Sequence, residues 1–197
     1  MIIRGIGKQY YEAISFFSDK LRLPDGILID FTYSNKMVEV PMALIIGAAT
    51  TVLLPQISKN KNLAEINKII KLTLIFSLFL SVFSFLVSPL IIEIVFGRSS
   101  FSEEQFNLLK VITSYSFLFL MPMSLTSLFG TVFSALRIIK PLAICGIIMI
   151  ASLFVLNLLL INLDNLKTIV ISFGSSYILG AIYLFYSYTK LKLRKTA

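Results

Sequence analysis

Four long runs of apolar residues dominate the pattern along this chain. They cover residues 72–92, 111–133, 141–162 and 168–188, and none of them contains a charged residue. A helix needs roughly 20 consecutive apolar residues to cross the hydrocarbon core of a bilayer. Each run reaches this length, so the sequence predicts four transmembrane helices.

A fifth apolar run, residues 40–54, is too short to cross a bilayer alone. Asp25 and Gly26, directly after Pro24, are typical of a helix start. A helix over residues 26–57 would be about 47 Å long, which exceeds the roughly 30 Å of the hydrocarbon core. We therefore predict a fifth span here, whose ends protrude from the core or whose axis is tilted.

Residues 1–22 form a weaker element, in which apolar residues recur at helical spacing with charged residues between them. The segment is either an amphipathic helix on the membrane surface or the end of a helix that lines a polar cavity. We divide the chain into this element with an outer loop, 1–24, a helix bundle, 25–189, and a basic tail, 190–197. The predicted fold class is all-α, a polytopic transmembrane bundle of five spans plus an N-terminal helix.

Basic residues gather in every second segment between the spans. Lysines and arginines outnumber acids in segments 58–71 and 134–140 and in the tail, whereas segments 93–110 and 163–167 are acidic or balanced. Cytoplasmic loops of membrane proteins carry an excess of lysine and arginine. We therefore expect both basic segments and the C-terminus to lie in the cytoplasm.

Composition supports a membrane protein and excludes several other classes. The chain is 57% hydrophobic and 14% charged, against about 25% charged in a typical soluble domain. Its net charge of +8 lies mainly in short segments between apolar runs, which indicates topology and not nucleic-acid binding. Histidine is absent and Cys145 is the single cysteine, so we expect neither a disulfide framework nor a histidine or cysteine metal site. Because Cys145 lies inside an apolar run, we expect it to be a packing residue.

Three stretches of the chain carry motifs in a fixed order. The first combines a tyrosine, a basic residue, a carboxylate and a proline: YSNKMVEVPMALIIGAATTVLLPQISK. The second is an outer loop followed by a helix with a tyrosine, IVFGRSSFSEEQFNLLKVITSYS, and the third is a basic turn, a proline and a helix, FSALRIIKPLAICGIIMIASLFVLNLLLI. In this order, over roughly residues 24–162, the chain resembles the MurJ/MviN family of lipid II flippases, within the multidrug/oligosaccharidyl-lipid/polysaccharide exporter superfamily.

The resemblance implies a function and a partner. Members of this family move lipid II, the undecaprenyl-pyrophosphate-linked peptidoglycan precursor, across the bacterial cytoplasmic membrane by alternating access. It covers only the second of the family's two lobes, so it implies half of a two-lobed exporter fold and a first-lobe half as partner. Two positions depart from the family pattern. Ser99 replaces a glycine after Arg98, and Lys36 replaces the usual arginine and cannot grip phosphate in the same bidentate way.

Three other functions remain open at this stage. Flippases for O-antigen or other lipid-linked oligosaccharides share parts of the pattern. A scaffold, or an inactive product of a truncated gene, would also explain why one lobe is covered. A membrane enzyme is disfavoured, because the sequence has no nucleophile–base set and no paired aspartate motif. There is no nucleotide-binding motif either, so we expect no cofactor and expect membrane potential or a coupled ion to drive transport.

A pyrophosphate headgroup is anionic, so a transport cavity for it needs cations on its helices. Lys36 and Glu39 are three residues apart, lie on one helix face and can pair. In a centred helix over 26–57, Lys36 would lie about 7 Å inside the core edge. A charge there is costly unless it faces protein or water. The alternative is that Lys36 snorkels to the outer interface.

Three further residues complete the predicted cavity set. Asp30 lies two turns before the pair and faces either the same cavity or the outer water. Arg4 and Lys8 become cavity cations only if the first segment ends a lining helix. We expect no catalytic residue and no metal ligand, because flipping requires no covalent chemistry.

Overall fold

The computed structural model describes residues 27–59, 63–97, 102–160 and 165–196, and within these ranges every regular element is a helix. The all-α prediction is confirmed for this part of the chain. The helices are, in chain order, α2 (Ile27–Lys59), α3 (Leu63–Phe96), α4 (Glu103–Leu118), α5 (Leu120–Ala135), α6 (Lys140–Leu159) and α7 (Asn165–Thr196).

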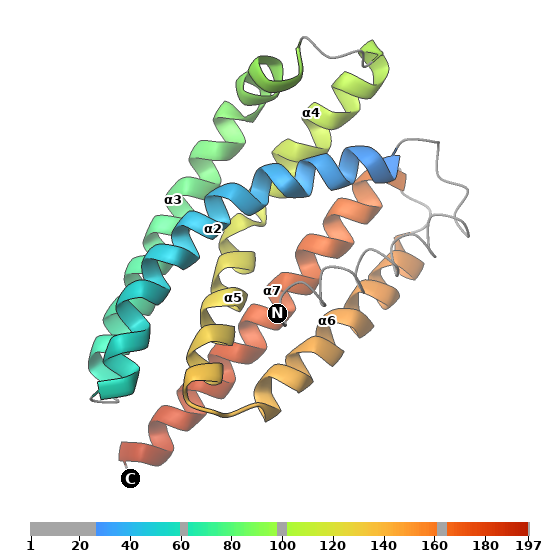
Figure 1. Cartoon of the computed structure of the whole chain (residues 1–197). Helices are drawn as coiled ribbons and strands as arrows, with labels where there is room; N and C mark the ends of the chain where they lie inside the picture. Colours follow the sequence, from blue (N-terminus) through green and yellow to red (C-terminus); the bar gives the residue numbers. More distant parts are fainter. Residues whose placement is uncertain (1–26, 60–62, 98–101, 161–164, 197) are drawn as a thin grey trace.

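The helices run up and down along one common direction. In Figure 1, α2 curves across α4 at the upper end and then runs beside α3, while α6 lies against α7. α2 ends and α3 begins at the lower end of that view, where the link between α5 and α6 and the C-terminus also lie, and α3 ends at the upper end. The described parts of the three basic segments therefore lie at one end of the bundle, and the cytoplasmic location of that end stays a prediction.

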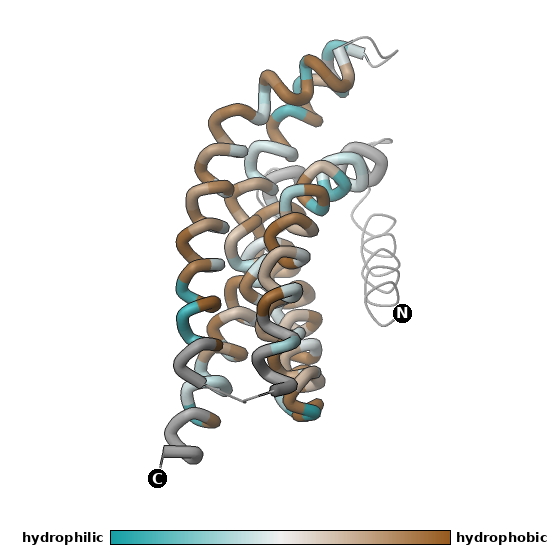
Figure 2. The backbone as a smooth tube through the Cα atoms, turned by 60° about the vertical axis from the view of Figure 1, so that its left-hand side comes forward, coloured by the Kyte–Doolittle hydropathy of each residue, from teal (hydrophilic) through white to brown (hydrophobic). Residues whose placement is uncertain are grey.

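Three helices are long and apolar enough to cross a membrane, among the residues that the structure describes: Ile66–Phe96, Lys140–Leu159 and Thr168–Leu191. The pair α4 and α5 provides a fourth if the two are counted as one broken span. In Figure 2, the brown of hydrophobic residues covers much of the length of the helices. The predicted helix over 26–57 is confirmed as one continuous helix, α2, but α2 is not among these candidates and its membrane crossing stays a prediction.

Helices extend beyond the apolar runs that predicted them. α3 begins at Leu63, inside the predicted polar segment 58–71, and α7 continues to Thr196 through the basic tail. An apolar run measures the part of a helix that lies in hydrocarbon, whereas backbone hydrogen bonding continues into the polar region. The 34 residues of α3 correspond to about 51 Å, well over the roughly 30 Å of the core.

The predicted single span over 111–133 is wrong in one respect, because it is broken at Phe119. The axes of α4 and α5 differ there by 49°. Pro122 has no N–H to offer the carbonyl of Leu118, and its ring crowds the preceding turn. Ser81 of α3 donates its hydroxyl to the carbonyls of Phe117, at 2.7 Å, and Leu118, at 3.2 Å. A neighbouring helix therefore satisfies backbone groups at the break, as a membrane interior requires.

Two glycines of α7 allow close contacts. A β-carbon at Gly174 would overlap the ring of Phe119, so the break lies directly against α7 at that point. A β-carbon at Gly180 would lie 2.9 Å from Cγ of Met149 and 3.2 Å from Sγ of Cys145. Cys145 is buried in this contact between α6 and α7, which confirms its predicted packing role.

The buried residues form two hydrophobic clusters. One cluster lies toward the lower end of Figure 1, and its fully buried large side chains are Ile66, Leu128, Phe129, Val132, Phe133 and Leu184. The other cluster joins α2, α4, α5, α6 and α7 and includes Val38, Ile45, Ile112, Phe117, Leu120 and Phe173.

The turn between α5 and α6 places a basic residue in an unusual backbone conformation. Arg137 has a φ of 58°, in the left-handed region that favours glycine. The N–H of Ile138 donates to the carbonyl of Phe133 at 2.9 Å, and that of Arg137 to Ser134 at 3.0 Å, which forms a Schellman motif. An arginine in this conformation costs about 1 kcal/mol relative to glycine, so a charge is kept here despite its cost to the backbone.

Candidate functional site

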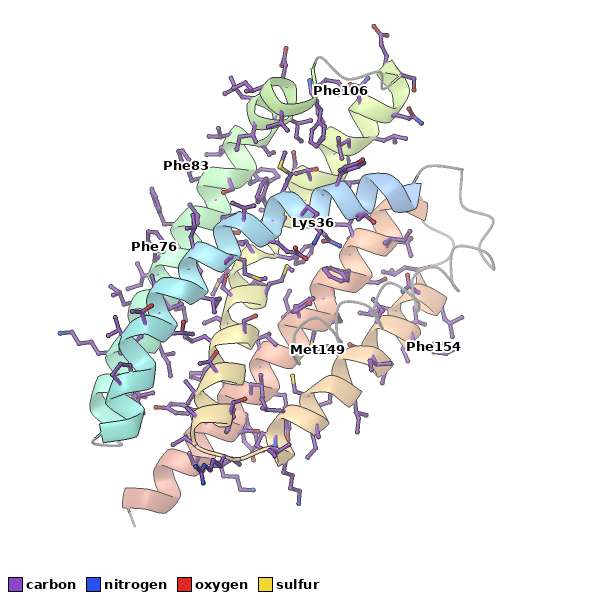
Figure 3. All side chains as sticks on the ribbon, in the orientation of Figure 1. Lys36, Phe76, Phe83, Phe106, Met149 and Phe154 are labelled. Atoms are coloured by element: carbon purple, nitrogen blue, oxygen red, sulfur yellow. The ribbon has the colours of Figure 1, made fainter. Side chains whose placement is uncertain are left out.

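Lys36 and Glu39 form an ion pair on the exposed face of α2. Their Nζ and Oε2 atoms lie 2.9 Å apart, and the two side chains are 70% and 50% exposed. Figure 3 shows Lys36 on the stretch of α2 that crosses α4. The predicted pairing is confirmed, and no described helix encloses the pair.

The opposite face of α2 holds this stretch in place. Ser34 and Val38, one turn apart, are both fully buried. The Ser34 hydroxyl donates to that of Ser116 on α4 at 3.0 Å. Because side chains two residues apart point to different faces of a helix, burial of Ser34 and Val38 leaves Lys36 on the open face.

The electrostatics of the pair suit reversible binding of an anion. An exposed ion pair on one helix contributes only about 0.3–0.5 kcal/mol. Phosphate oxygens form charge-assisted hydrogen bonds with lysine that are stronger than those between neutral groups. Lys36 can therefore exchange Glu39 for a phosphate group at little cost.

The other predicted cavity residues fall outside what the structure describes. Arg4 and Lys8 lie outside the described residues. Asp30 belongs to α2, but its side chain lies outside the described part. Of the five predicted residues, the structure thus brings together Lys36 and Glu39. Across the described ranges, no three histidine, cysteine, aspartate or glutamate side chains converge so that they could hold a metal ion.

Sequence reasoning missed a second lysine, at the upper end of the bundle. Lys110 of α4 is 28% exposed, and its Nζ lies 3.8 Å from Oε2 of Glu93 on α3 and 4.5 Å from the centre of the Phe106 ring. These contacts join the upper ends of α3 and α4. The spacing of four between Phe106 and Lys110 is a signal that the sequence offered, but the segment 93–110 was predicted to be an outer loop.

Comparison with known families identifies the chain. The family model described as "Lipid II flippase MurJ" matches residues 23–196. The chain belongs to the MurJ family. No curated protein and no solved structure matches it. The MurJ match extends beyond the resemblance over 24–162 and includes all the described helices.

Membership of the MurJ family agrees with the apolar helices. The helices indicate a membrane protein, and the family is one of transport for peptidoglycan biosynthesis. The family is one of flippases and not of enzymes. Lys36, Glu39 and Lys110 all lie inside the matched MurJ region, on α2 and α4.

Proposed function

We propose that this chain is part of a flippase that moves lipid II outward across the bacterial cytoplasmic membrane by alternating access. The observation that carries the proposal is a cation, Lys36, on the open face of a long helix in a chain of the MurJ family. Lipid II carries an anionic pyrophosphate between its lipid and its sugars. A cation on an open helix face is the group that such a headgroup requires.

Glu39 has a role in the empty transporter. While no substrate is bound, the carboxylate neutralises Lys36 at 2.9 Å, which lowers the cost of holding a charge near hydrocarbon. When the pyrophosphate arrives, its oxygens replace the carboxylate as partners of Lys36. The lipid tail stays in the bilayer while the headgroup passes along the open face of α2.

The same exchange offers a way to couple transport to an energy source. Once Lys36 turns to the substrate, Glu39 carries an unpaired negative charge. A cation that binds Glu39 would restore neutrality and couple its own gradient to the step. Membrane potential acts on the same charges, at about 2.3 kcal/mol for each elementary charge per 100 mV. No cofactor is needed for either route.

The proposed topology places the lower end of Figure 1, with its basic segments and the C-terminus, in the cytoplasm. α2 then also crosses the membrane, which brings the number of spans to five. The chain forms the second lobe of a two-lobed transporter, and a first-lobe half completes the cavity. Asp30, Arg4 and Lys8 would contribute to the cavity if the N-terminal segment lines it.

The family match favours lipid II over other lipid-linked glycans, because the matching model describes a lipid II flippase. A flippase for O-antigen or related oligosaccharides would also bind its pyrophosphate through Lys36. An inactive or scaffold protein would bind no such substrate. Complementation of flippase-depleted cells distinguishes these cases. Rescue of peptidoglycan synthesis indicates lipid II, and failure of the chain with a first-lobe chain present indicates one of the others.

The test of the site replaces Lys36 in that assay. Lys36→Gln should lower outward transport of lipid II by roughly ten- to hundredfold, because it removes a charged hydrogen bond. Lys36→Arg keeps the charge and should retain transport. Lys71→Gln, which removes an exposed lysine at the lower end of α3, is the matched control and should behave like the unmodified chain. Full transport by Lys36→Gln would refute the role of Lys36.

A further inference from the structure

The contact between α2 and α4 includes buried polar side chains beside its apolar ones. The Ser34 and Ser116 hydroxyls, 3.0 Å apart, join the two helices, and both side chains are buried. Thr113 lies three residues before Ser116, on the same face of α4, and is 1% exposed. Neither its Oγ1 nor the buried Oδ1 of Asn35 on α2 has a hydrogen-bond partner among the described residues. We call these four residues the α2–α4 seam.

A permanently closed contact would not favour this composition. A buried hydroxyl or amide oxygen that lacks a partner costs free energy, and an apolar side chain of the same shape would avoid that cost. Such atoms are few in native proteins and each requires an explanation, of which a binding role is one. The seam therefore favours a second arrangement in which Thr113 and Asn35 contact polar groups.

The fold offers a way to open the seam. The break at Phe119 comes three residues after Ser116. Because α4 and α5 are not one continuous helix, α4 can change its orientation while α5 stays in place. At its other end α4 is held to α3 by Lys110 and Glu93, whose charged atoms are 3.8 Å apart. An opening there would expose the seam directly beside Lys36, which follows Asn35 in the chain.

We propose that the α2–α4 seam opens during transport and that Ser34, Asn35, Thr113 and Ser116 bind the uncharged sugars of the lipid-linked headgroup beside Lys36. Hydroxyl and amide side chains both donate and accept hydrogen bonds without charge, which matches the hydroxyl groups of a glycan. This inference rests on the proposed function and assigns the two parts of the headgroup to different residues. Lys36 binds the pyrophosphate, and the seam binds the sugars.

Thr113→Val tests the seam because it removes one hydroxyl and keeps the volume. Binding of lipid II and of undecaprenyl pyrophosphate, which has no sugars, is measured by titration with the full chain and a first-lobe chain together in lipid nanodiscs. Thr113→Val and Ser116→Ala should each weaken binding of lipid II roughly fivefold, by the loss of one neutral hydrogen bond. Neither should change binding of undecaprenyl pyrophosphate, whereas Lys36→Gln should weaken binding of both lipids.

Ser172→Ala is the matched control. Its hydroxyl is also fully buried and has no partner within the described ranges, but it lies on α7 and not on a seam helix. This variant should bind both lipids like the unmodified chain. Thermal unfolding of Thr113→Val should occur at the same or a higher temperature, because an unpaired hydroxyl has been removed.

The possible failures can be told apart. Unchanged lipid II binding by Thr113→Val and Ser116→Ala would overturn the seam proposal alone. So would equal weakening for both lipids together with a lower unfolding temperature, since that would show a structural role. If the unmodified chain and a first-lobe chain together bind neither lipid, the proposed function itself fails, and the seam proposal fails with it.

Discussion

Small residues decide where the described helices can approach one another. Gly174 lies under the ring of Phe119, at the point where the chain turns from α4 into α5. Gly180 lies against Met149 and Cys145 of α6. Helices in lipid have no hydrophobic driving force for association, so close packing of this kind contributes much of the energy that holds them together.

Gly174→Ala should destabilise the protein. The added methyl group meets the Phe119 ring with no space to occupy, and such overpacking typically costs about 1–3 kcal/mol. Gly130→Ala is the control, because a β-carbon there has no neighbour within 4 Å in the part of the chain that the structure describes. Alanine in a helix is favoured over glycine by about 0.5–1 kcal/mol. Thermal unfolding in detergent should show a lower midpoint for the first variant and an equal or higher one for the second. Equal midpoints for the two would refute the Phe119 contact.

The sequence allowed some of the site residues to be found, but not others. Lys36 and Glu39 were predictable because charges are rare near apolar runs and their spacing allows pairing. Lys110 was missed because its partner Glu93 is on another helix, so their contact depends on how α3 and α4 pack. Thr113 and Ser116 gave no signal, since hydroxyl residues are common in this chain and only the helix register shows which of them face α2.

The break between α4 and α5 depends on three helices at once. Pro122 causes it, Ser81 of α3 satisfies carbonyls that it affects, and Gly174 of α7 receives Phe119. Thr126 donates to the carbonyl of Pro122 at 2.8 Å and continues the hydrogen bonding of α5 below the proline. The bend is therefore a built feature of the bundle and not local fraying.

Ser81→Ala should be destabilising by about 1–3 kcal/mol, because it leaves the carbonyls of Phe117 and Leu118 without their hydroxyl partner. Ser77→Ala is the matched control. Ser77 is one turn away and equally buried, but its hydroxyl donates only to the carbonyl of Leu74 in its own helix. Unfolding midpoints of the two variants should differ clearly. A Ser81→Ala midpoint equal to that of Ser77→Ala would count against this account of the break.

At the level of elements, the apolar runs placed the helices well but not their ends or bends. The runs 72–92, 141–162 and 168–188 each lie almost wholly within one described helix. The run 111–133 concealed the break, because the effect of Pro122 depends on whether a neighbour such as Ser81 can satisfy the carbonyl groups that it frees. Polar helix ends, as in α3 and α7, leave no trace in an apolar pattern.

Among the described residues, the exposed faces of α3 and α2 are both largely apolar, but the α2 face also carries an ion pair. The exposed face of α3 is apolar along its length, with Phe76, Phe83 and Leu90 at 52%, 50% and 59% exposure. The exposed residues of α2 include the ion pair of Lys36 and Glu39, but also the apolar Val40 and Leu44, at 63% and 69% exposure. Ala43 is exposed on the same face, two turns after Lys36. Lipid contact suits the apolar face of α3, whereas the path proposed for Lys36 requires that water reach the face of α2.

Reaction of introduced cysteines with a water-soluble thiol reagent tests this difference most directly, in a chain in which Cys145 is replaced by alanine. Ala43 and Leu90 are both exposed, but on α2 and α3 respectively. If α2 crosses the bilayer along a hydrated path, Ala43→Cys should react in intact membranes and Leu90→Cys should not. Absence of reaction at both positions would place the face of α2 against lipid and contradict the transport path proposed for Lys36.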